Sequence, residues 1–137
     1  MKIAMYIPVF VLLVAVSLLA CIRLAPTDAA RWQQPIAATS SVDLPGGAIR
    51  VSAAGPQALA RVDAAARALP RTRVLAGSVE EGRITYVTRS AAIGFPDYTT
   101  VEYSDGLIRM FARLRFGRSD LGVNRKRLER LLVAAKG

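Results

Sequence analysis

The chain contains no histidine, and its 137 residues include a single cysteine, Cys21. Zinc sites draw largely on cysteine and histidine, and Ser-His-Asp and Cys-His nucleophilic groups require histidine. These classes of site are therefore excluded, as is a disulfide within the chain. We expect no bound metal, no cofactor and no enzyme of the common hydrolase classes, whereas chemistry based on carboxylate, tyrosine or lysine side chains stays open.

Charged side chains are missing from residues 3–22, where only Pro8 and Ser17 interrupt the apolar sequence. A helix rises about 1.5 Å per residue, so a run of this length spans about 30 Å, the thickness of a bilayer's hydrocarbon core. Arg23 closes the run, where its side chain can reach the lipid headgroups. Residues 1–23 are therefore predicted to form a transmembrane signal-anchor, which makes the membrane the first expected partner.

Three processing histories are compatible with this segment. A retained anchor is favoured, because the run is longer than the roughly 7–15 apolar residues of a cleavable signal peptide. Leu18, Leu19 and Ala20 before Cys21 also look like a loose lipobox, which would make Cys21 the lipidated first residue of a lipoprotein. Ordinary cleavage at a small residue is the third.

The charges on either side of the run favour one orientation. Lys2 and the α-amino group precede it, whereas Arg23 and Arg31 follow it with Asp28 between them. Positively charged flanks stay in the cytoplasm, and this small bias favours a cytoplasmic N-terminus. We therefore expect a single-pass protein of the inner (cytoplasmic) membrane whose C-terminal domain lies in the periplasm.

The rest of the chain has the length of one domain. Residues 24–47 contain Pro26, Pro35, Pro45 and the pair Gly46-Gly47, with no sustained hydrophobic period. Such a composition predicts a tether. Residues 48–137 are then expected to form the folded domain.

The domain is predicted to be α+β. Residues 48–53 suit a short edge strand, and a helix that stops at Pro70 follows, with apolar residues at helical spacing: Leu59, Val62, Ala66 and Leu69. Strands are expected over residues 71–79, 83–90, 98–103 and 107–116, the last two joined through Asp105-Gly106. A helix over 120–135 carries the apolar stripe Leu121, Leu128, Leu131, Leu132 and Ala135. The predicted architecture is thus an N-terminal transmembrane helix followed by a four-stranded antiparallel meander flanked by two helices.

Alternation along the last predicted strand separates two faces. One face is apolar and is expected to point to the core: Ile108, Met110, Ala112, Leu114 and Phe116. The other carries three arginines around an aromatic ring: Arg109, Phe111, Arg113 and Arg115. This second face, which Arg89 on a neighbouring strand would extend, has two interpretations. It is either a solvated surface or a platform for phosphate or carboxylate groups. Stacking of bases on Phe111 is the least supported interpretation, so no nucleic acid partner is expected.

Basic residues outnumber acidic ones by 19 to 10 and gather in the last quarter of the chain. From Leu107 onward only Asp120 and Glu129 oppose nine basic residues: Arg109, Arg113, Arg115, Arg118, Arg125, Lys126, Arg127, Arg130 and Lys136. In a tethered domain such a patch meets anionic lipid headgroups first. Each basic residue near the membrane surface contributes about 1 kcal/mol to the free energy of binding to such a membrane.

The segment 115–125 has two interpretations. As a strand-to-helix turn, it uses Ser119 or Asp120 to cap the helix, and Asn124 forms a local hydrogen bond. As a binding site, it forms a polar pocket in which helix amides face an anion, lined by Arg115, Ser119, Asp120, Asn124 and Arg125. An acid–base pair of Asp97 and Asp120 is less favoured, because nearby arginines should hold both carboxylates ionised in pairs with Arg89 or Arg115.

The same stretch carries a family resemblance. Residues 115–129, RFGRSDLGVNRKRLE, resemble the closing signature of the bacterial domain of unknown function family 1499. Arg89-Ser90 followed by Gly94-Phe95 and Asp97 is similar to the family's second motif, and the segments 23–26 and 30–32 resemble its membrane-anchored branch. The resemblance covers most of residues 24–135 and is specific in its last third. It implies a fold and an envelope location but no reaction, and Tyr98 stands where members commonly have a second acidic residue.

Together these features predict a membrane-tethered envelope protein, non-catalytic, that binds an anionic ligand, an anionic lipid or an envelope protein. The predicted ligand-binding residues are Arg89, Asp97, Arg109, Arg113, Arg115, Ser119, Asp120, Asn124 and Arg125. The alternatives are an envelope hydrolase that uses Asp97 and Asp120, and a purely structural partner of a membrane complex.

The orientation can be tested by fusing alkaline phosphatase after Gly137. Because this enzyme folds only in an oxidising compartment, a periplasmic C-terminus is expected to give an active fusion. A fusion that accumulates stably yet stays inactive would reverse the topology.

Overall fold

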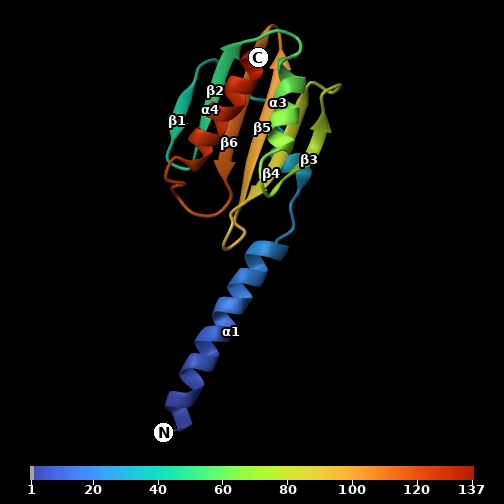
Figure 1. Ribbon diagram of the computed structural model, residues 1–137. Coiled ribbons are helices and arrows are strands. Elements are labelled where there is room, and N and C mark those ends of the chain that lie inside the picture. Colours follow the sequence, from blue (N-terminus) through green and yellow to red (C-terminus); the bar gives the residue numbers. More distant parts are fainter. Residues whose placement is uncertain (1) are drawn as a thin grey trace.

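The computed structural model describes residues 2–137 and begins with a long helix, α1 (Lys2–Leu24), that projects from one end of a separate domain (Figure 1). Its segment Ala4–Leu24 has a mean hydropathy of 2.7, and none of it is buried in the protein. This helix is long and apolar enough to span a membrane, and a signal sequence would meet the same criterion.

The domain is built on one six-stranded antiparallel sheet, with the order β1-β2-β6-β5-β4-β3. The strands are β1 (Val42–Leu44), β2 (Gly47–Ala53), β3 (Thr72–Ser78), β4 (Arg83–Arg89), β5 (Pro96–Ser104) and β6 (Leu107–Leu114). The four strands predicted as a meander are present and adjacent, but the prediction of four strands is wrong. Strand β2, expected at an edge, lies between β1 and β6, where Ala48 pairs with Ala112. These pairings join distant segments, and β1 is too short and too exposed to show alternation.

Two helices, α3 (Ala58–Arg67) and α4 (Val123–Lys136), cover one face of this sheet (Figure 1). The main core lies between these helices and the sheet, and its largest members are Tyr86, Ile84, Ile108, Met110, Leu128 and Leu131. Two residues depart from the predicted core. Leu121 is 90% exposed, because it lies in the turn before α4 with a φ of 53°. Phe116 is also exposed, since β6 ends before it.

The opposite face of the sheet is covered by residues 25–36, which include the one-turn helix α2 (Ala29–Trp32). The Trp32 ring stacks on Tyr98 of β5 with centroids 3.9 Å apart, and Ile36 is buried as well. This segment and β1 belong to the stretch 24–47 that was predicted to be a tether. The structure therefore differs from a free linker, because an aromatic pair and buried apolar surface hold the segment against the sheet.

The packing of Trp32 can be tested with Trp32→Ala in the full chain in detergent. Trp32 is 8% exposed, so truncation should lower the free energy of unfolding by about 3 kcal/mol or more. Urea denaturation followed by circular dichroism measures the change. Val133→Ala, at a position 72% exposed, is the matched control and should stay within about 0.5 kcal/mol of wild type. Equal stability of the two variants would contradict the packing.

Candidate functional site

Two of the arginines predicted to face outward, Arg113 in β6 and Arg115 just after it, bind the chain itself. Arg113 donates a 2.9 Å hydrogen bond from Nη2 to the carbonyl oxygen of Trp32, and Arg115 donates one of 2.9 Å to that of Pro26. Burial lowers the pKa of Arg113 to about 10, so its guanidinium stays charged at neutral pH. The predicted arginine platform is thus not an open surface, because two of its three arginines fasten residues 25–36 to the sheet.

The turn before α4 is held by Asp120. Its Oδ1 accepts a hydrogen bond from the backbone N of Gly122 at 2.9 Å, and its Oδ2 accepts one from Asn124 at 3.0 Å. Ser119 Oγ accepts a third, from Leu121 N at 3.3 Å. Of the two residues predicted to cap the helix, Asp120 does so, because its carboxylate satisfies the Asn124 amide that α4 leaves without a partner. Ser119 instead binds the amide of Leu121, before the helix begins.

Asp97 belongs to a buried polar cluster with two side chains of α4. Asn124, which has no exposed surface, donates from Nδ2 to Asp97 Oδ2 at 3.3 Å. Arg127 places Nη1 3.6 Å from the same oxygen and donates to Asn124 Oδ1. The ion pair expected with Arg89 or Arg115 is thus made with Arg127. The sequence predicts only one part of this cluster: Asn124 and Arg127 are three residues apart on a helix and are therefore neighbours.

Burial raises the pKa of the Asp97 carboxyl, and the nearby Arg127 offsets this effect only in part. The pKa of Asp97 therefore moves in the direction opposite to the one that pairing with an arginine alone would give. Desolvation disfavours the charged form of a buried carboxyl, and here it outweighs one guanidinium at 3.6 Å.

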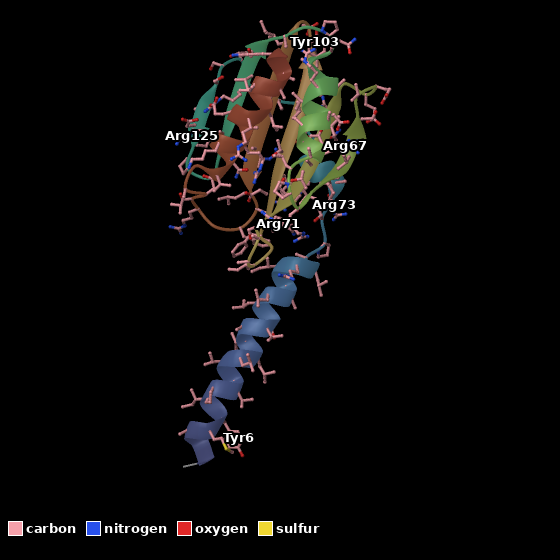
Figure 2. All side chains as sticks on the ribbon, viewed as in Figure 1. Tyr6, Arg67, Arg71, Arg73, Tyr103 and Arg125 are labelled. Carbon is pink, nitrogen blue, oxygen red and sulfur yellow. The ribbon has the colours of Figure 1, made fainter. Side chains whose placement is uncertain are left out.

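A pocket of about 580 Å³ opens beside this cluster. Its lining brings together four of the predicted site residues, Arg89, Asp97, Ser119 and Asp120, with Arg71 and Arg127. Other predicted residues lie elsewhere. Arg109 donates to Ser104 at 2.9 Å, and Arg125 lies 3.7 Å from Asp43 on the side of the domain that carries β1 (Figure 2).

A second pocket of about 580 Å³ adjoins the first and shares Arg71, Arg89, Ser90 and Ala91 with it. We call it the arginine pocket; its lining is Arg23, Arg71, Thr72, Arg73, Val87, Arg89, Ser90, Ala91 and Gly94. Four of these nine residues are arginines and none is acidic. Figure 2 shows Arg71 and Arg73 at the end of the domain that faces α1.

Backbone carbonyl groups hold three of these arginine side chains in place. Arg71 Nε donates to the carbonyl oxygen of Arg89 at 3.0 Å, and Arg89 Nη1 donates to that of Gly94 at 2.9 Å. Arg23 Nε donates to the carbonyl oxygen of Ile93 at 3.1 Å. A guanidinium has five N–H donors, so each keeps donors for a ligand.

No carboxylate of the described residues lies within 4.0 Å of the guanidinium groups of Arg23, Arg71, Arg73 or Arg89. Arg71 also has a φ of 53°, in the left-handed region that non-glycine residues rarely adopt. Strain of this kind concentrates at binding sites. Sequence reasoning missed Arg71 and Arg73, which follow the helix-ending Pro70 without any motif.

No group of three or more Cys, Asp or Glu side chains in the described part of the chain could hold a metal ion.

The raised pKa of Asp97 predicts how an Asp97→Asn variant behaves. The folded chain keeps the Asp97 proton above its ordinary pKa of 3.8, where the unfolded chain has released it. Ionisation of Asp97 therefore lowers the free energy of unfolding as pH rises from 3.8 through the raised value. Urea denaturation at a series of pH values should show the variant gaining stability relative to wild type across this range. A constant or falling difference would contradict the assignment.

The comparisons with known proteins agree with the motifs in the sequence. No curated protein and no solved structure matches this chain significantly. The family model described as Protein of unknown function (DUF1499) matches residues 25–134, which include all of the domain's strands and the segment packed across the sheet. The match confirms the resemblance noted from residues 89–97 and 115–129, and the chain belongs to the DUF1499 family of proteins of unknown function.

Proposed function

We propose that this protein is a membrane-tethered binding domain of the bacterial envelope, which holds an anionic ligand in the arginine pocket without changing it chemically. One observation carries the proposal. Arg23, Arg71, Arg73 and Arg89 line a single pocket, and no carboxylate of the described residues pairs with them. Like charges crowd together at a cost in free energy, and a bound anion removes that cost.

The proposed ligand site differs from the one expected from the sequence. Arg89 belongs to both, whereas Arg113 and Arg115 donate to the backbone of residues 25–36. A guanidinium binds phosphate or carboxylate oxygens through paired N–H donors, which makes arginine suited to this role. An acidic patch on an envelope protein would present the same groups to the pocket.

The proposal includes the location of the domain. We place α1 across the cytoplasmic membrane as a single-pass anchor and the domain in the periplasm. The support is the apolar segment Ala4–Leu24 together with the greater positive charge before it.

An envelope hydrolase is the second candidate, because a buried carboxyl with a raised pKa suits a general acid and Asp97 borders a pocket. It ranks lower for a structural reason. Both carboxylate oxygens of Asp120 accept backbone hydrogen bonds, so this residue is held as a helix cap rather than presented to a substrate.

The proposal is tested with the full chain in detergent and inorganic phosphate as the probe, by isothermal titration calorimetry. Arg71→Gln/Arg73→Gln should weaken phosphate binding about tenfold or more, because charged hydrogen bonds contribute about 1.5–3 kcal/mol each. Arg118→Gln/Lys136→Gln removes the same charge outside the pocket and should bind phosphate as wild type does.

Equal binding by both double variants would overturn the arginine pocket as the binding site. Hydrolysis of a phosphate ester by the full chain, abolished by Asp97→Asn, would overturn the non-catalytic role and support the hydrolase.

A further inference from the structure

Arg23 belongs both to the apolar helix α1 and to the arginine pocket. It lies in the last turn of α1, inside the segment Ala4–Leu24 that is long enough to span a membrane, and it also lines the arginine pocket. A helix rises about 1.5 Å per residue, so this residue stands about 30 Å from the start of the apolar run, at the edge of the hydrocarbon core. Lipid phosphate groups lie at that depth.

The rest of the pocket is held close to Arg23. The loop between β4 and β5 lies at the end of α1 (Figure 1), and Arg23 donates to the carbonyl oxygens of Ile93 and Ala92 in this loop. A side chain at Gly94 would come within 3.3 Å of Arg23 Nε, so loop and helix end are in near contact. Ser90 Oγ accepts hydrogen bonds from the backbone N of Gly94 and Phe95, which fixes the loop's shape.

The chain that follows α1 contains no free linker that would separate the domain from the end of this helix. Ala25 N still donates to the carbonyl oxygen of Cys21 at 2.9 Å, and Pro26 is bound by Arg115. Trp32 is stacked on the sheet a few residues later. With α1 in a membrane, the arginine pocket therefore lies at the level of the headgroups.

The chemistry of the pocket selects among headgroups. Its lining offers four guanidinium groups and no acidic side chain, so it attracts phosphate oxygens and repels the ammonium group of a zwitterionic lipid. Its volume of about 580 Å³ is that of a site for a small molecule. The Arg73 guanidinium forms no hydrogen bond or ion pair with the described residues, so it keeps all its N–H donors for such a group.

We infer that the arginine pocket binds the phosphate of an anionic lipid lacking an ammonium group, taken from the bilayer that holds α1. This inference rests on the proposed function, since it names the ligand of the same pocket. Free phosphate has the same chemistry and is the competing source.

The experiment uses the full chain in a neutral detergent, with added phosphatidylglycerol or phosphatidylcholine, and counts the retained lipids by native mass spectrometry. Wild type should retain phosphatidylglycerol at least tenfold more than phosphatidylcholine. In Arg71→Gln/Arg73→Gln the ratio of retained phosphatidylglycerol to phosphatidylcholine should fall about tenfold. In Arg118→Gln/Lys136→Gln this ratio should stay as in wild type. Trp32 fluorescence checks that each variant is folded, because Trp32 is the only tryptophan.

The outcomes separate the two proposals. If the pocket binds inorganic phosphate but wild type retains the two lipids equally, the lipid inference fails and the proposed function stands. If both double variants lose the lipid preference alike, attraction to the whole basic surface explains it and the inference also fails. If neither phosphate nor phosphatidylglycerol binds, both proposals fail.

Discussion

The position of the arginine pocket depends on the attachment of residues 25–36 to the outer face of the sheet. Trp32 stacks on Tyr98, and Arg113 lies 5.1 Å from the centre of the Trp32 ring while it donates to the Trp32 carbonyl. Without this contact, α1 would be joined to the domain by a proline-containing linker, and only the hydrogen bonds of Arg23 to Ile93 and Ala92 would hold it near Arg71 and Arg89. An aromatic pair and a partly buried cation thus convert a sequence that looks like a tether into a rigid connection.

Arginine has three separate roles in this domain, distinguished by what each guanidinium contacts. Some are in ion pairs, such as Arg50 with Asp43 and Glu129, which joins β1, β2 and α4. Others, such as Arg113, bind carbonyl oxygens of the chain and contribute to the fold. Three of the four arginines of the pocket are held by backbone carbonyl groups, and all four keep N–H donors that bind no described residue. Net charge alone could not separate these roles, because all of them add equally to it.

The buried cluster of Asp97, Asn124 and Arg127 joins the start of β5 to the first turns of α4. Its members satisfy one another, which a buried polar group requires, and Asp120 accepts hydrogen bonds from the backbone amides of Gly122 and Asn124. The family motif around residues 119–125 therefore has a structural explanation in helix capping. The adjoining arginine pocket lies mostly outside the motif residues, and its arginines are separated in the sequence by almost fifty residues between Arg23 and Arg71.

The sequence by itself determined the apolar helix, the α+β class, the meander of β3 to β6 and the cap at Asp120, because each depends on local spacing: an uncharged run, a period of two, a period of 3.6, or a short polar side chain before a helix. Tertiary structure decided the rest. Only pairing between distant segments placed β2 beside β6, and only tertiary contacts, those of Trp32 with Tyr98 and of Arg23 with Ile93, brought the end of α1 to Arg71 and Arg89. Whether Arg113 faces a ligand or the chain's own backbone depends on which segment crosses the sheet, and alternation along one strand carries no information about that.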